Sequence, residues 1–93
     1  MMEQFEWHNE KNELNQKKHN ISFQEAITIF EDPLAIYKPD TEHSDFEERS
    51  YIIGKSNKNK LIVVSFTERQ NNIRIITARL ATKKEIRNYE NQI

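Results

Sequence analysis

The chain contains no cysteine, only one glycine and no long apolar run. The missing cysteine excludes disulfide bonds, a thiolate nucleophile and cysteine-ligated metals. A single glycine, Gly54, excludes the glycine-rich loops that bind the phosphates of ATP, GTP and NAD. The three histidines form no spaced ligand pair either. We therefore expect a protein that uses neither a metal nor a cofactor.

No segment of the chain predicts export or membrane insertion. The longest unbroken aliphatic run, residues 61–64, is far shorter than the ~20 residues that cross a bilayer. Residues 1–6 lack the basic region and the apolar run of a secretory signal peptide. With 93 residues, of which 35% are hydrophobic, the chain has no room for a separate cofactor-binding half. We expect a single domain, residues 1–93, in the cytoplasm.

The charged residues, 31% of the chain, are divided by sign between its two halves. Residues 1–48 contain four Lys and twelve Asp or Glu, for a net charge of −8. Residues 49–87 contain ten Lys or Arg and two Glu, for +8, and Glu90 brings the chain to −1. Such asymmetry is typical of a nucleic-acid surface, an acidic partner, or both.

Two helices are predicted in the acidic half, after a short strand at residues 4–7. The first covers residues 10–19, with Asn9 as its N-cap, Leu14 as its clear core residue and Asn20 as a left-handed C-cap. Because it has so little apolar surface, this helix must be solvated or covered by a partner.

The second helix is predicted over residues 23–31 and begins with a capping box, Ser22 and Glu25. Its buried face has the helical spacing of Phe23, Ala26, Ile27 and Phe30. It ends at Asp32-Pro33. A short strand at residues 34–37 and an acidic loop at residues 39–47 follow.

The apolar period then changes to two. Strands are predicted at residues 49–54, 60–67 and 72–79, joined by short turns that contain asparagine. Thr82 and Glu85 form another capping box and open a last helix. The predicted fold is α+β, with two helices ahead of an antiparallel meander and one after it.

Arginines are interleaved with the strands of the meander, at Arg49, Arg69, Arg74 and Arg79. The planar guanidinium fork binds phosphate through two hydrogen bonds and stays charged at every relevant pH. Strict alternation places Arg74 and Arg79 on opposite faces, so they share a site only if a bulge intervenes or the strand ends before Arg79. The alternative is a solvated sheet edge without a ligand. The last helix adds the candidate cations Lys83, Lys84 and Arg87.

Few side chains are candidates for proton transfer. Histidine ordinarily titrates near neutral pH, and His19, beside Lys18, is either an acid–base group or a helix C-terminal residue stabilised by the dipole. We interpret His8 and His43 as exposed surface residues. Glu68 is either a general base or a member of a surface ion pair.

Several segments of the chain occur in the same order in one known protein family. They are Phe5-Glu6-Trp7 with Asn9, Lys18-His19-Asn20-Ile21-Ser22-Phe23, Phe30-Glu31-Asp32-Pro33-Leu34, Glu47-Glu48-Arg49, Thr67-Glu68-Arg69 and Ile73-Arg74-Ile75-Ile76-Thr77-Ala78-Arg79. From Phe5 to about Tyr89 the chain resembles the BrnT family of ribonuclease toxins of type II toxin–antitoxin systems. Asn20 stands where the family usually has glycine, and the segment after Arg79 is less rich in arginine than the family's.

The resemblance implies a RelE-like fold and a metal-independent endoribonuclease that inhibits translation. It also implies a BrnA-like ribbon-helix-helix antitoxin, which forms a complex with two copies of each protein. The toxin reaches operator DNA only through this antitoxin. The basic segment would then face RNA, and the antitoxin would occlude it.

We expect the 2′-hydroxyl of the RNA itself to attack the adjacent phosphate, because the chain has no cysteine or serine motif. Arg49, Arg74 and Arg79 would stabilise the charged transition state. Lys18, His19 or Glu68 would move protons. The cations expected to bind RNA are Arg69, Lys83, Lys84 and Arg87. The alternative function is a non-catalytic module that binds nucleic acid and antitoxin as a co-repressor.

Overall fold

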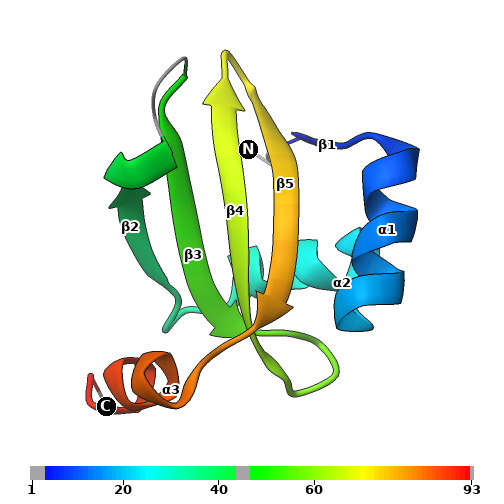
Figure 1. Cartoon of the computed structure of the whole chain (residues 1–93). Coiled ribbons are helices and arrows are strands. Elements are labelled where there is room, and N and C mark those ends of the chain that lie inside the picture. The colour runs from blue at the N-terminus through cyan, green and yellow to red at the C-terminus, as the bar shows by residue number, and fades with distance from the viewer. Residues whose placement is uncertain (1–3, 44–46, 93) are drawn as a thin grey trace.

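The computed structural model describes residues 4–43 and 47–92, which form one five-stranded sheet with helices around it (Figure 1). The elements are β1 (Gln4–Glu6), α1 (Asn9–His19), α2 (Phe23–Ala26), the 3₁₀ helix η1 (Ile27–Glu31), β2 (Ile36–Asp40), the 3₁₀ turn η2 (Thr41–His43), β3 (Arg49–Lys55), β4 (Leu61–Arg69), β5 (Asn72–Leu80) and α3 (Lys83–Glu90). This mixed architecture confirms the predicted α+β class. In the described part of the chain, no helix has the length and apolar character needed to cross a membrane.

The strands lie in the order β1-β5-β4-β3-β2. β2 to β5 pair antiparallel, so the predicted meander is confirmed, whereas β1 pairs parallel with β5 through Phe5 and Ile73. Asn59 (φ 67°) and Gln70 (φ 54°) occupy the left-handed positions of the two short turns, where the chain has no glycine. The strand expected at residues 34–37 lies instead at Ile36–Asp40 and takes up the start of the predicted acidic loop. Residues 44–46 of that loop lie outside the described residues.

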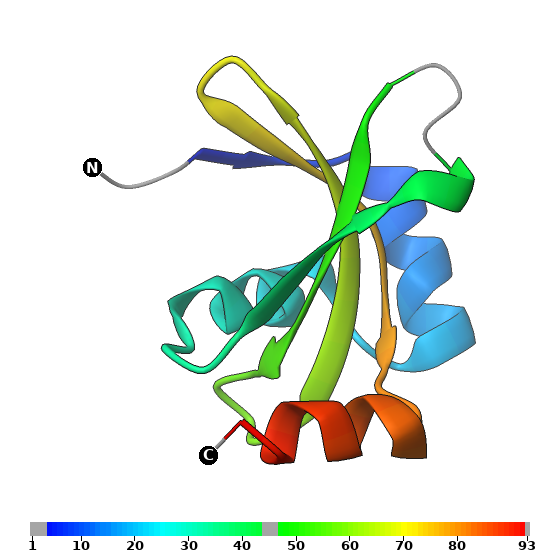
Figure 2. The ribbon, with the colours of Figure 1, turned by 90° about the vertical axis from the view of Figure 1, so that its left-hand side faces the viewer.

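The two faces of the sheet are covered by different elements (Figure 2). α2 and η1 cover one face, and the main core there is formed by Ile21, Phe23, Ala26, Ile29, Ile52, Ile62, Val64, Phe66, Ile73, Ile75 and Ala78. On the other face α3 crosses one end of the sheet, where Tyr89 packs against Ile53 and Val63. Among the described residues no α-helix lies over the rest of this second face, which we call the open face.

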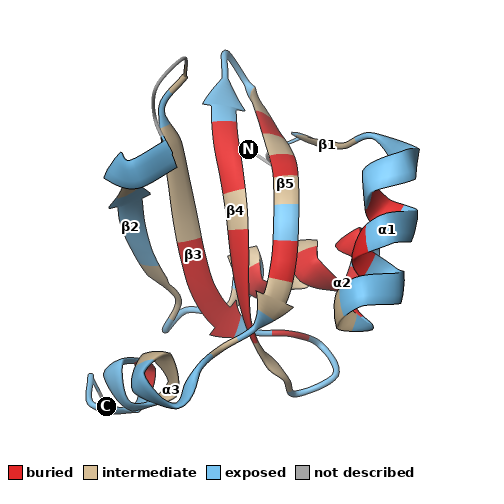
Figure 3. Cartoon of the chain, viewed as in Figure 1, coloured by how far each residue is buried: buried red, intermediate tan, exposed pale blue. Residues whose placement is uncertain are grey.

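α1 is held by polar side chains, so the prediction of Leu14 as its core residue is wrong. Leu14 is 64% exposed, whereas Asn12 and Asn15 are buried. Figure 3 shows that α1 is exposed over most of its surface. Nδ2 of Asn15 donates to the carbonyl oxygens of Ala78 and Ile21 at 2.8 and 2.9 Å, and its Oδ1 accepts from the Ala78 N–H at 3.1 Å. The amide therefore takes the place of a neighbouring strand along the part of β5 that β1 does not reach.

The ends of α1 follow the prediction only in part. Asn20 is the left-handed C-cap, with φ 58°, as predicted. At the other end Asn9 is the first helical residue and His8 is the N-cap, without a side-chain hydrogen bond, so the prediction of Asn9 as the cap is wrong. His8 has the extended dihedrals of an N-cap, with φ −86° and ψ 130°.

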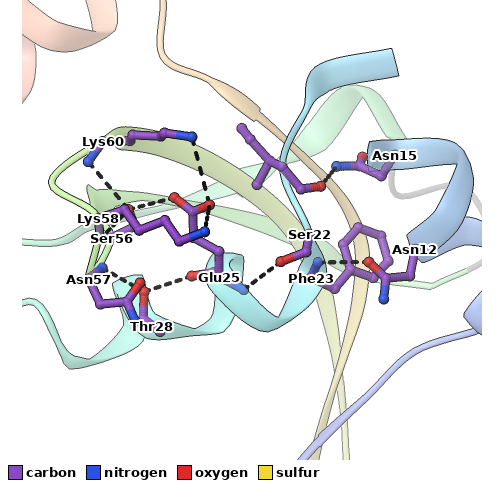
Figure 4. Close-up of polar contacts among 11 residues, drawn as sticks. Asn12, Asn15, Ser22, Phe23, Glu25, Thr28, Ser56, Asn57, Lys58 and Lys60 are labelled. Atoms are coloured by element: carbon purple, nitrogen blue, oxygen red, sulfur yellow. Dashed lines mark hydrogen bonds and ion pairs between the residues drawn. The ribbon is translucent and has the colours of Figure 1, made fainter. Parts of the chain in front are cut away.

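The second predicted helix is one α-helical turn, α2, followed by the 3₁₀ helix η1. The N–H of Glu25 donates to Ser22 Oγ, but the Glu25 side chain does not return to the cap (Figure 4). Instead its Oε2 accepts from Ser56 Oγ at 2.8 Å, and the Nζ atoms of Lys58 and Lys60 lie 4.0 and 3.9 Å from its Oε1. A buried carboxylate needs such partners, so tertiary contacts replace half of the predicted capping box.

Candidate active site

A hollow of about 370 Å³ lies on the open face of the sheet. Its floor is formed by β3, β4 and β5, and its sides are formed by η2 with the end of β2 and by the first turn of α3. The lining residues are Asp40, Glu42, His43, Arg49, Tyr51, Val63, Ser65, Ile76, Thr77, Arg79 and Glu85. Two arginines, a histidine and three hydroxyl groups thus line one cavity together with three carboxylates. The guanidinium and hydroxyl groups are hydrogen-bond donors suited to a phosphate ester.

A β-bulge in β5 decides which arginines share this face. Ser65 pairs with Thr77 and the next residue, Phe66, pairs with Ile75, so Ile76 is the extra residue. Because of this shift, Arg74 pairs with Thr67 and Arg79 pairs with Val63. Thr67 and Val63 are four residues apart in β4 and lie on the same side of it, so the two arginines also lie on one face. One of the two conditions stated for a shared site, a bulge between the arginines, is met.

Arg79 is fixed in the hollow by the first turn of α3. Its Nη1 and Nη2 donate to Oε1 and Oε2 of Glu85 at 2.8 and 3.0 Å. The Thr82–Glu85 capping box, which is confirmed, orients this carboxylate because Thr82 N–H also donates to Oε1 at 2.8 Å. The hydrogen bonds from Arg79 lower the pKa of Glu85 to about 2, and the same contact raises the pKa of Arg79.

The other arginines of the meander spread along the open face from the hollow toward the β4–β5 turn. Arg49 lines the hollow. Arg74 lies outside it and donates to Glu6 of β1 at 3.1 Å, while its buried Nε has no hydrogen-bond partner among the described residues. Arg69 donates to Glu47 at 2.8 Å, which lowers the pKa of Glu47 and raises that of Arg69.

His43 is the site residue that the sequence interpretation missed. It is exposed, as expected, but it lines the hollow, and its Nδ1 lies 3.0 and 3.2 Å from Oδ2 and Oδ1 of Asp40. Asp40 ends β2 and pairs in register with Arg49 of β3. In the sequence, the sign of this pair is that Asp40 and His43 are three residues apart. That spacing brings the two side chains together because β2 ends at Asp40 and the 3₁₀ turn η2 follows it.

The remaining predicted residues do not line the hollow. Lys18 and His19 are in the last turn of α1, beside the edge of β5. Glu68 is exposed near the end of β4, on the side of the sheet opposite to Arg74. The three cations predicted on the last helix, Lys83, Lys84 and Arg87, are exposed on α3. The structure therefore brings Arg49 and Arg79 together and leaves the predicted proton-transfer groups elsewhere.

Comparison with known proteins identifies the family. A family model described as "Ribonuclease toxin, BrnT, of type II toxin-antitoxin system" matches residues 7–85. The fold is similar to that of a 1.1 Å crystal structure of the Brucella abortus ribonuclease toxin BrnT, with a TM-score of 0.69 and 21% identity over 88% of this chain and 100% of that one. No curated protein sequence matches the chain. Since the family model covers most of its length, the chain belongs to the BrnT family of ribonuclease toxins of type II toxin–antitoxin systems.

Proposed function

We propose that this toxin is a metal-independent endoribonuclease of RelE-like fold that cleaves RNA in the hollow on the open face and so inhibits translation. The observation that carries the proposal is the convergence of Arg49 and Arg79 on one cavity floored by the sheet. The RNA 2′-hydroxyl attacks the neighbouring phosphorus and the 5′-oxygen leaves, so the protein needs no nucleophile of its own. Its task is to stabilise the additional negative charge on the phosphate oxygens.

The arginines divide this work by position. Arg49 and Arg79 contact the reacting phosphate, and the planar fork of Arg79 is already held in place by Glu85. Arg74 and Arg69, farther along the open face, contact flanking phosphates of the same strand. Lys18, His19 and Glu68 lie outside the hollow, so we assign them no proton transfer at the reacting phosphate.

The partner we propose is a BrnA-like ribbon-helix-helix antitoxin in a complex with two copies of each protein. It covers the arginines of the open face and connects the toxin to operator DNA. The proposal is supported by the family's place in type II systems and by the accumulation of positive charge in residues 49–87.

The test compares Arg79→Gln with Lys11→Gln, which removes the same charge from the exposed surface of α1. We expect Arg79→Gln to lower the cleavage rate of a single-stranded RNA by ~10²–10³-fold in EDTA-containing buffer. Arg49→Gln should do the same, and Lys11→Gln should stay near the wild-type rate. Equal loss in all three variants, or full activity of both arginine variants, would show that the hollow is not the site.

The second candidate function is the non-catalytic co-repressor. It is favoured by the ion pairs of Arg74 with Glu6 and of Arg79 with Glu85, because these carboxylates already bind the two guanidinium groups. It predicts that the purified wild-type protein cleaves no RNA under any of these conditions, and that its expression alone does not stop growth.

A further inference from the structure

We infer that His43 is the general base of RNA cleavage and that Asp40 is the carboxylate that orients it. This inference rests on the proposed ribonuclease function and adds to it the group that removes the proton from the 2′-hydroxyl. His43 and the two arginines of the hollow line the same cavity, although they come from separate parts of the chain.

The contact with Asp40 determines which nitrogen of His43 can act as a base. An ionised carboxylate only accepts hydrogen bonds, so the ring nitrogen that faces it, Nδ1, must carry the proton. Nε2 then has the free lone pair and is the ring nitrogen that can accept a proton from substrate. This is the arrangement in which a carboxylate sets the tautomer of a catalytic histidine.

Asp40 is suited to orienting the ring because it is the more firmly held partner. Its side chain is 18% exposed and its backbone pairs with Arg49 in the sheet, whereas the side chain of His43 is 62% exposed. A half-buried carboxylate on a strand thus positions an accessible imidazole that lines the hollow. Accessibility is what a group that exchanges protons with substrate and then with water requires.

The other charged groups around His43 are poor candidates for the same task. Glu85, opposite it on α3, has a pKa of about 2 and both of its oxygens bound to Arg79, so it is a very weak base. Arg49 and Arg79 stay protonated and serve as cations. Glu42, next to His43, is an exposed carboxylate. Histidine, by contrast, is the side chain that most often acts as a general base in enzymes.

The chemical step is balanced without any further reactant. The proton of the 2′-hydroxyl passes to Nε2 of His43, and the O2′–P bond forms as the P–O5′ bond breaks. The departing 5′-oxygen takes a proton from water, and the imidazolium later returns its proton to solvent. The products are a 2′,3′-cyclic phosphate and a 5′-hydroxyl, with no change of oxidation state.

The test measures cleavage of a single-stranded RNA by wild type, His43→Ala, Asp40→Asn and the control His8→Ala, in which the lost imidazole is exposed outside the hollow. We expect kcat of His43→Ala to fall by ~10²–10⁴-fold. The affinity for an uncleavable 2′-deoxy analogue should stay within about threefold, since His43 carries no phosphate contact in this proposal. His8→Ala should behave as wild type.

The pH dependence separates a base from a merely structural residue. Asp40, Glu42, Arg49, Arg79 and Glu85 all surround His43, so the profile is read as a comparison between variants. The wild-type rate should fall as acid protonates histidine, and this fall should be absent in His43→Ala. Added imidazole should restore part of the lost rate in His43→Ala, and Asp40→Asn should retain the pH dependence at a lower rate.

The outcomes distinguish this inference from the proposed function. Cleavage by His43→Ala at near the wild-type rate, or an unchanged acid limb in that variant, overturns the role of His43 while the arginine site still stands. Loss of activity in His19→Ala but not in His43→Ala would also overturn it. If the wild-type protein cleaves no RNA at all, the ribonuclease proposal fails first.

Discussion

Replacing Asn15 by alanine should be among the most destabilising single changes in α1, although the helix has hardly any apolar surface. The change removes three hydrogen bonds and leaves the N–H and C=O of Ala78 without their side-chain partners in a site where Asn15 is only 7% exposed. An orphaned buried polar group costs ~1–3 kcal/mol, so the loss should be about 3 kcal/mol. For a domain of this size such a loss lowers Tm by roughly 12–24 °C.

The assay is urea denaturation followed by circular dichroism, with Leu14→Ala as the matched control on the same helix. Leu14 is 64% exposed, so its truncation should change the free energy of unfolding by less than ~0.5 kcal/mol. Asn15→Asp keeps the acceptor for the Ala78 N–H but removes the donor and adds a buried charge, so it should be at least as destabilised near pH 7 and should recover as acid protonates it. If Leu14→Ala costs more than Asn15→Ala, the description of α1 as a helix held by its amides is wrong.

Three further changes test the remaining parts of the fold. Since Arg79 holds the pKa of Glu85 at about 2 instead of 4.5, the pair's stabilisation should be complete above pH 4.5 and lost as pH falls toward 2. Glu85→Gln should therefore cost about 1–2 kcal/mol at pH 7 and nothing near pH 2 in urea titrations, and a gap that does not change with pH would contradict this. Burial and the hydrogen bond to Asp32 raise the pKa of Tyr89 to about 12, so ultraviolet titration should show one tyrosine ionising there, and Tyr89→Phe should abolish that step and cost about 1–2 kcal/mol. Gly54→Ala should cost about 1–3 kcal/mol in the same assay, because its Cβ would lie 3.1 Å from η1, and a neutral result would mean that η1 moves away freely.

The parts of the fold that the sequence predicted well depend on interactions within a few residues. The capping box of Thr82 and Glu85 and the left-handed Asn20 need only their own neighbours, and both are present. The meander follows from the period-two pattern and from connections too short for any other pairing. In each case the local preference and the tertiary structure agree.

The features that the sequence did not predict are set by contacts between distant residues. The Glu25 side chain does not complete the predicted capping box because its carboxylate accepts a hydrogen bond from Ser56, 31 residues later. The extra residue Ile76 in β5 appears only in the pairing with β4, so alternation alone could not place Arg79. His43 joins the site because η2 folds back over β3, in a segment that has no periodic pattern.

The division of charge along the sequence also takes on a meaning in three dimensions. Glu6 and Glu47, both from the acidic half, pair with Arg74 and Arg69 of the basic half. We expect a phosphate that binds these arginines to compete with the carboxylates, and this competition would weaken non-specific binding of RNA. Part of the negative charge thus offsets the positive surface instead of remaining separate from it.

The amide of Asn15 has a consequence for self-association. Exposed strand edges are the places where a second chain can add a strand and begin to aggregate. On the edge of β5, β1 pairs with residues 72–74, and the Asn15 side chain of α1 binds the backbone of Ala78. A strand and a helix side chain thus cover different parts of this edge. Among the described residues, β1 and β2 are the outermost strands, and the outer side of β2 adjoins the side of the hollow formed by Asp40 and His43. A chain that adds a strand there would come to lie directly beside the cavity.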